Sequence, residues 1–200
     1  QHSARLRGAS AARMIDPCAP LAPPRGAPLM HQTWGKLLFL HWAVPEERIR
    51  PHVPRALSID TWDGSAWIGI TPFTLWGVRP HGFPAVPFLS RSHELNLRTY
   101  VHLDGVPGVW FLSLDASNPL AVIGARFGFH LPYFQARMSL EEKDDGVRFT
   151  SQPVRRSGKP ATFLAEWTVR QPLESPAPDS FELFAIGRYC LYAGHEGRLY

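Results

Sequence analysis

The stretch HELNLRTYVHLDGVPGVWFLSLDA, residues 93–116, constrains the fold most, because its pattern is that of a β-hairpin. Polar and apolar residues alternate in its first half, which places the two kinds on opposite faces of a strand. Asp104-Gly105 is a turn-forming pair. Residues 109–114 are nearly all apolar, as expected of a strand buried on both faces. The stretch therefore predicts a fold built on antiparallel strands.

Turn-forming residues divide the rest of the chain into short elements. Twenty prolines and 16 glycines among 200 residues favour many short strands and turns over a helical bundle. A closed or cone-shaped barrel with a few peripheral helices fits this succession best. We expect strands at 33–44, on both sides of Asp63-Gly64, and around 129–140, 147–154 and 161–169, with short helices in 44–54, 117–128 and 179–192.

The basic charge of the chain is concentrated in its first 29 residues. That segment carries a net charge of +3 out of +4 for the whole chain, and it has little amphipathic pattern. We expect residues 1–29 to be a disordered Ala/Arg/Pro-rich tail and residues 30–200 to form a single domain. Nucleic-acid binding needs basic residues clustered on the folded part. Only Arg155, Arg156 and Lys159 offer such a cluster, so we expect no nucleic-acid partner.

Several other classes of protein are disfavoured by what the sequence lacks. The two cysteines, Cys18 and Cys190, form no close pair, which favours a reducing compartment such as the cytoplasm. No apolar run reaches the roughly 18–20 residues that span a bilayer. The nine histidines show no metal-binding spacing, and no nucleotide-binding loop or nucleophile elbow is present. We therefore expect no membrane partner, no metal and no cofactor.

A polar row on the first strand of the hairpin is the most informative feature for function. Glu94, Asn96, Arg98 and Tyr100 are two residues apart and so share one face of the strand. That face either points to solvent, as in many antiparallel sheets, or lines a pocket if the sheet curls into a barrel. Inward charges have to be paired or bind a ligand. The residues alone leave both alternatives open.

Two further side chains have a structural and a functional interpretation. Arg126 lies at the end of the expected helix at 117–128, where the last carbonyls favour a cation. A guanidinium can equally grip both oxygens of a carboxylate. His41, within the apolar stretch LFLHWAV, is either a hydrogen-bonded core residue or a group that titrates near neutral pH.

Six stretches together resemble a known family. WGKLLFLHWAVP, DGSAWIGITPF, HELNLRTYV, GVWFLSLDA, the pair of segments AR and LPYFQA, and RYCLY follow one another in this order over residues 32–200. They resemble the YqjF-like family, bacterial proteins of unknown function within the acetoacetate decarboxylase-like superfamily. The resemblance implies a cytoplasmic protein with a cone-shaped, mainly antiparallel β-barrel around an internal pocket. It implies no assigned reaction.

The decarboxylases of that superfamily differ from this chain at their catalytic lysine. Glu94 is similar to a glutamate on a pocket strand of these enzymes, and Arg126 is similar to an arginine of theirs. The element that carries their Schiff-base lysine resembles LPYF, where Tyr133 and Phe134 stand at the lysine positions. Because a Schiff base needs a primary amine, this departure argues against an imine mechanism. Of the three lysines, only Lys36 precedes an apolar strand, which gives it a route towards the interior.

These observations lead to one leading hypothesis and one alternative. We expect a pocket for a small molecule, such as an organic acid or a similar polar metabolite, with Glu94 as the candidate acid or base. The alternative is a structural or regulatory module, in which Glu94, Arg98 and Arg126 form internal salt bridges and close the interior. Compared with the family, the chain stops before further strands, and a homo-oligomer is compatible with the pattern. The expected ligand-binding residues are Arg126, Glu94, Arg98, Tyr133, Asn96 and His41.

Overall fold

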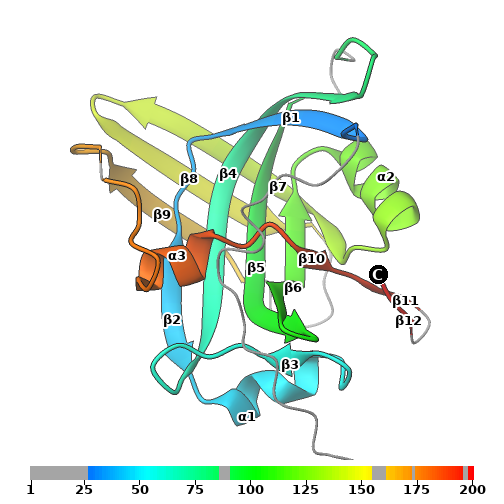
Figure 1. Ribbon diagram of the computed structural model, residues 1–200. Coiled ribbons are helices and arrows are strands. Elements are labelled where there is room, and N and C mark those ends of the chain that lie inside the picture. Colours follow the sequence, from blue (N-terminus) through cyan, green and yellow to red (C-terminus); the bar gives the residue numbers. More distant parts are fainter. Residues whose placement is uncertain (1–26, 86–90, 155–160, 173, 196–197) are drawn as a thin grey trace, which may run out of the picture.

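The computed structural model, shown in Figure 1, describes residues 27–85, 91–154, 161–172, 174–195 and 198–200. Most of the expected tail, and Arg155, Arg156 and Lys159, lie outside the described residues. The main sheet has the order β1(Met30–Gly35), β4(Ala66–Pro80), β5(Ser92–Leu103), β6(Val106–Ala116), β7(Tyr133–Lys143), β8(Gly146–Pro153) and β9(Phe163–Thr168). Three short strands attach to it: β2(Leu40–Val44) to β4, β3(Ser58–Ile59) to β5, and β10(Leu191–Tyr192) to β6. Two more, β11(Gly194–His195) and β12(Arg198–Leu199), pair with each other.

The hairpin predicted at 93–116 is confirmed as β5 and β6. Asp104 and Gly105 both have positive φ, at 50° and 80°, as a two-residue turn between antiparallel strands requires. Nearly all other pairings in the sheet are antiparallel too, and only β7 and β10 run parallel to β6. The predicted fold class, mainly β with a few short helices, is therefore confirmed.

Strands lie on both sides of Asp63-Gly64, as predicted. Trp62 and Ser65 exchange both backbone hydrogen bonds around this pair, so the turn reverses the chain locally. The strands before and after it, β3 and β4, both pair antiparallel with β5, at Ile59↔Val101 and at Ile68↔Thr99. The two strands therefore run in the same direction and do not pair with each other.

The segment predicted as one strand at 33–44 is divided in two. Its halves, β1 and β2, pair with successive parts of the 15-residue strand β4. Lys36, in the break between them, has a positive φ of 52°, which ends the extended backbone of β1. One long strand thus holds two short partners along the same edge.

The three predicted helices are present, with shifted ends. The first is α1(Glu46–Ile49), continued by the 3₁₀ turn η2(Arg50–His52). Asn118 caps α2(Pro119–Phe129), and the helix passes Gly128 and ends at His130, whose φ is 53°. Ser180 caps α3(Phe181–Ile186), because its hydroxyl accepts the hydrogen bond from the Leu183 amide.

The helices cover different faces of the sheet, which we name by the residues of β5. The inner face carries Glu94, Asn96, Arg98 and Tyr100; the outer face carries the residues between them. On the inner face, α3 contributes Phe184 and Ala185 to a cluster with Tyr100 and Val109. On the outer face, Ile49, Val53, Leu57, Ala66, Val101 and Tyr192 form a second cluster.

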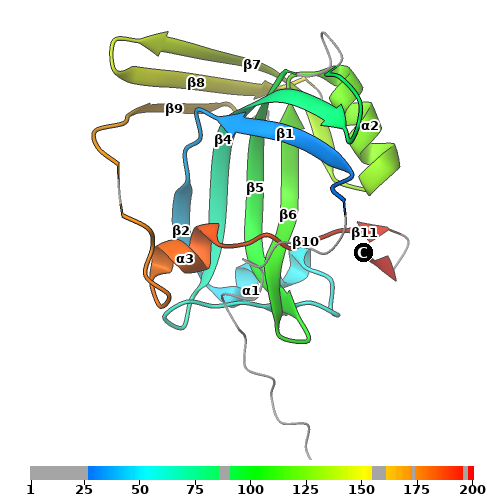
Figure 2. The same ribbon diagram turned by 45° about the horizontal axis from the view of Figure 1, so that its top comes forward.

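The sheet curls strongly at one end. In Figure 2, β7, β8 and β9 cross over the top of β4, β5 and β6, whereas α3 lies lower, in front of β2 and β4. The curl brings β7 close enough to β5 for their side chains to meet across β6. This is a half-barrel with its polar row on the inner face.

Candidate functional site

The polar row of β5 is buried. Glu94, Asn96, Arg98 and Tyr100 are exposed by only 3%, 6%, 7% and 0%. The interpretation as a solvent-facing side of the sheet is therefore wrong, and the interpretation as an inward face is confirmed. Burial of three charged or amide groups in succession requires an account of each partner.

Side chains of β4 stand opposite this row and complete its surroundings. Thr71 lies across from Asn96, and Gly69 lies across from Arg98. A side chain at Gly69 would place its Cβ 3.3 Å from Arg98 Nε and 3.1 Å from the Tyr100 hydroxyl. The absence of a side chain there leaves the space that the Arg98 guanidinium occupies.

Arg98 is a buried cation without an acidic partner. Its Nη2 donates to the carbonyl of Ala185 at 3.0 Å, and its guanidinium lies 5.2 Å from the centroid of the Phe39 ring. Among the described residues, no carboxylate lies within 4.0 Å of it. A buried charge is normally paired, so the desolvation cost of the Arg98 guanidinium is not offset by any described acidic side chain.

Three buried polar atoms around Arg98 have no hydrogen-bond partner in the described part of the chain. They are Thr71 Oγ1 on β4, Asn96 Oδ1 directly opposite on β5, and Nε of Arg98 itself. Buried polar groups in native proteins nearly always have a partner, which can be an ordered water or a ligand. The three atoms offer a hydroxyl, an acceptor and a cationic donor on one face.

Glu94 and Tyr133 form the second polar contact of the inner face. The Tyr133 hydroxyl on β7 donates to Glu94 Oε2 on β5 at 3.0 Å, across the intervening strand β6. Burial raises the pKa of Glu94 to about 7, although the hydrogen bond from Tyr133 opposes this shift. The pKa of Tyr133 is also raised, first by burial and then by the Glu94 charge. At neutral pH the Glu94 carboxyl can therefore either donate or accept a proton.

His41 belongs to the inner face as a hydrogen-bonded residue. Its Nε2 lies 2.7 Å from the Tyr100 hydroxyl, which also donates to the Ala185 carbonyl at 3.1 Å. Because that hydroxyl has a single proton, His41 Nε2–H is the donor in their contact whenever Tyr100 bonds Ala185. Desolvation and the nearby Arg98 charge lower the pKa of His41 to about 4. His41 is thus neutral near pH 7.

Arg126 is separated from the other predicted residues. Its Nε donates to the Tyr133 carbonyl at 2.6 Å, and its guanidinium lies 5.4 Å from the Phe134 ring centroid. Phe134 and Tyr133 are neighbours in β7, so their side chains point to opposite faces. The structure therefore brings Glu94, Asn96, Arg98, Tyr133 and His41 together on the inner face and leaves Arg126 apart and exposed.

None of the described lysines reaches the inner face. Lys36 Nζ donates to Glu142 Oε2 at 2.5 Å in an exposed ion pair, and Lys143 is exposed. Lys159 lies outside the described residues. The described residues also contain no group of three or more potential metal ligands. The described side chains of this face offer a carboxyl, a phenol, an amide, a guanidinium, an imidazole and a hydroxyl.

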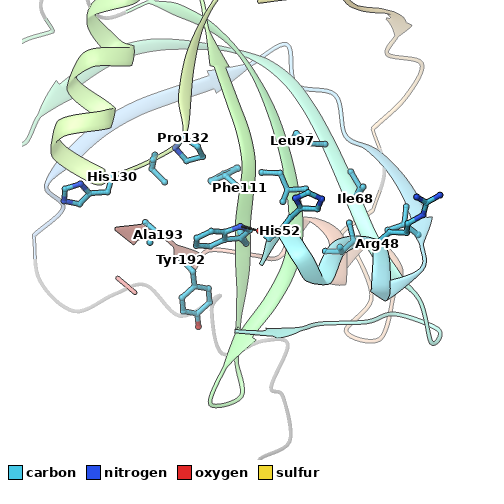
Figure 3. A pocket seen from close by; sticks show the side chains of 15 residues that line it. Arg48, His52, Ile68, Leu97, Phe111, His130, Pro132, Tyr192 and Ala193 are labelled. Atoms are coloured by element: carbon cyan, nitrogen blue, oxygen red, sulfur yellow. Dashed lines mark hydrogen bonds between the residues drawn. The ribbon is translucent and has the colours of Figure 1, made fainter. Parts of the chain in front are cut away.

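A cavity of about 630 Å³ lies on the outer face, and none of the six predicted residues lines it. Figure 3 shows its lining side chains spread from His130 at one end to Arg48 at the other.

No described helix is both long and apolar enough to cross a bilayer.

Sequence reasoning missed four residues of the inner face. Phe39 and Gly69 shape the space of Arg98, Thr71 adds an unpartnered hydroxyl, and the Ala185 carbonyl accepts two hydrogen bonds. Gly69 and Thr71 are two residues apart in one strand, so they share a face of it. Pairing that strand with the strand of the polar row could have identified them. No local pattern indicates the role of Ala185.

The fold is shared with solved proteins of low sequence identity. The enduracididine biosynthesis enzyme MppR, in a structure with pyruvate, superposes with a TM-score of 0.60 at 13% identity. The match covers 84% of this chain and 65% of MppR, so the chain spans less than two thirds of that enzyme. The acetoacetate decarboxylase of Legionella pneumophila gives a TM-score of 0.47 at 12% identity, over 73% of this chain and 56% of that one.

Residues 31–200 match the model of the DUF2071 family, described as an uncharacterized conserved protein. The chain is also 42% identical over 180 residues to the uncharacterized protein YqjF of Bacillus subtilis. That match covers 88% of this chain and 72% of YqjF. The chain therefore belongs to the DUF2071 family, as its sequence stretches implied.

Proposed function

We propose that this protein binds a small organic anion on the inner face of its sheet, with Arg98 as the anchoring cation. One observation carries the proposal: the buried Arg98 guanidinium has no carboxylate partner among the described residues and leaves its Nε unpartnered. An anionic group of a ligand would supply the missing charge and accept from Nε. The role first predicted for Arg126 is thereby proposed for Arg98.

The neighbouring polar atoms suggest what else such a ligand carries. Thr71 Oγ1 and Asn96 Oδ1 are unpartnered beside Arg98, so a hydroxyl or a similar donor on the ligand would satisfy the amide oxygen. Glu94, with a pKa of about 7, would donate to or accept from a second polar group. A small hydroxy or keto acid has this combination of groups, and Glu94 is the candidate acid or base if a reaction occurs.

The proposal contains no Schiff-base step. Tyr133 stands where the decarboxylases carry their amine, and it is hydrogen-bonded to Glu94. MppR is described in complex with pyruvate, and binding of a related acid by this chain is part of the proposal. We place this binding in the cytoplasm on the ground of the family resemblance.

A second candidate is a closed structural module without a ligand. The Ala185 carbonyl favours it, because Arg98 and Tyr100 both donate to this one acceptor and so tie α3 to the sheet. The ion pair between Glu94 and Arg98 that this alternative expects does not occur among the described contacts. The two candidates differ in whether added ligand stabilises the protein.

A thermal-shift panel of keto, hydroxy and dicarboxylic acids tests the proposal. A ligand present at about 100 times its Kd should stabilise the fold by about 2.7 kcal/mol. Arg98→Gln should weaken the binding of any such acid by at least about tenfold, because it removes the buried cation. Arg126→Gln, which removes an exposed guanidinium, serves as the matched control and should leave the shift unchanged.

Two results would contradict the proposal. A panel without any shift would favour the closed module. If Arg126→Gln lost the thermal shift and Arg98→Gln kept it, the anchoring cation would be Arg126, on the opposite face of β7.

A further inference from the structure

Two neighbouring cavities on the outer face share a wall. The larger, of about 630 Å³, and the smaller, of about 360 Å³, are both lined by Trp110 and Gly194. The larger volume lies within the usual range of small-molecule pockets. The polar row of the inner face lines neither cavity, so this region does not depend on the function proposed above.

The larger cavity opens where one edge of β6 changes its partner. Val109 and Trp110 pair with β10, whereas Leu114, Asp115 and Ala116 pair with β7. Between these two segments, no described strand pairs with this edge. A bulge falls in the same interval, since Leu97 faces Ser113 and Arg98 faces Phe111, which leaves Leu112 without a direct partner. The diverging strands β7 and β10 therefore leave an opening over Phe111 and Leu112.

Both cavities combine apolar and basic lining residues. Trp110, Phe111 and Tyr192 are among the apolar lining of the larger cavity, and each cavity has three basic residues. Among the described lining residues of either cavity there is no Asp or Glu. Among the described residues, no carboxylate lies within 4.0 Å of the arginines that line them. The basic residues are Arg48, His52 and His130 in the larger cavity, and Arg55, His195 and Arg198 in the smaller.

The shared wall is fixed in position. The Trp110 indole donates from Nε1 to the His52 carbonyl at 3.0 Å, which holds the ring where the two linings meet. A Cβ at Gly194 would lie 3.0 Å from the Trp110 ring, so the glycine allows β11 to pass close to the indole. An elongated ligand lying along this ring would contact the linings of both cavities.

We propose that this double cavity is a binding site for an amphipathic anion. Its apolar body would lie in the larger cavity, against Trp110 and Leu131, and its carboxylate or phosphate head would lie between Arg55 and Arg198. Burial of the body supplies the affinity, and the two guanidinium groups favour a negative head over a neutral or positive one.

Calorimetric titration with matched decyl compounds tests this site. Decanoate and decyl phosphate, used below their micelle-forming concentrations, should each bind at one site on the 200-residue chain. Decanol and decyltrimethylammonium should bind at least about tenfold more weakly, because they lack the negative head. Which of the two anions binds more tightly identifies the head group as carboxylate or phosphate.

Four variants, the controls included, locate the site. Arg55→Gln combined with Arg198→Gln should weaken both anions at least about tenfold, whereas the control Arg137→Gln combined with Arg170→Gln, which removes two exposed charges elsewhere, should not. Leu131→Trp should fill the larger cavity and abolish binding while circular dichroism and the unfolding midpoint show an intact fold. Arg98→Gln, on the other face, should bind decanoate as the unaltered chain does.

The inference is overturned by equal binding of anion, alcohol and ammonium compound, or by binding that survives Leu131→Trp. Loss of decanoate binding in Arg98→Gln would also overturn it, because the anion would then occupy the inner face. Loss of inner-face binding alone leaves this site unaffected, so the two proposals fail separately.

Discussion

Replacing Arg188 with methionine is expected to destabilise the protein by about 3–5 kcal/mol, the cost of breaking a buried ion pair on one side. Arg188 Nη1 lies 2.6 Å from Asp60 Oδ2, and the two side chains are 4% and 9% exposed. The guanidinium also donates to the Phe184 carbonyl at 2.7 Å and lies 4.4 Å from the Phe184 ring centroid. The substitution would leave Asp60 buried without its cation and would detach the end of α3 from the sheet. Urea denaturation monitored by circular dichroism measures the loss.

Two control variants give this prediction its meaning. Arg148→Gln removes an arginine whose partner, Glu166, lies 3.3 Å away in an exposed pair, and it should cost less than about 1 kcal/mol. Combining Asp60→Asn with Arg188→Met removes both buried charges and should recover a large part of the single-variant loss. Equal losses for Arg188→Met and Arg148→Gln would show that the buried pair contributes no more than an exposed one.

Replacing Glu94 with glutamine is expected to stabilise the protein at pH 8 by about 3 kcal/mol and to leave it nearly unchanged at pH 4. The pKa of Glu94 is raised from the ordinary 4.5 to about 7 by burial. The folded state therefore holds a proton that the unfolded state releases above about pH 4.5. Stability falls as the pH rises towards 7, after which both states are ionised and the loss is complete. Glutamine does not ionise, so it lacks this loss.

The measurement is the difference in unfolding free energy between the two proteins across pH 4–8. His41 acts in the opposite direction, because its lowered pKa of about 4 makes stability rise as the pH increases towards 6.5. Both proteins contain His41, so its contribution cancels in the difference. Tyr133→Phe, which removes the hydroxyl that opposes the shift, should raise the pKa of Glu94 further. A flat difference would mean that Glu94 ionises freely in the folded state.

The sequence allowed the central hairpin and the site face to be predicted, for a clear physical reason. Alternation at period two places Glu94, Asn96 and Arg98 on one face whatever the rest of the fold does. Whether that face is buried depends on the curl of the sheet, which is a long-range property. The family resemblance indicated that the face is buried, because a cone-shaped barrel turns such a face inward.

Other features could not be read from local patterns. The turn at Asp63-Gly64 has the chemistry of a hairpin, yet β3 and β4 both pair with β5, and only strand register decides this. Arg126 falls on the far side of β7 because Tyr133, and not Phe134, points inward. The outer cavities depend on where β10 and β7 leave β6, which involves segments about 80 residues apart in the chain.

The change of partner along β6 also has a dynamic consequence. Main-chain amides are hydrogen-bonded at both ends of β6, for example that of Val109 at the end near β10 and that of Leu114 at the end near β7. The amides between them that point away from β5 face the cavity instead. Deuterium should therefore enter this strand first in its middle, between two slowly exchanging segments, which is the reverse of ordinary fraying from the ends. A molecule bound in the outer cavity would slow that exchange and make the strand uniform along its length.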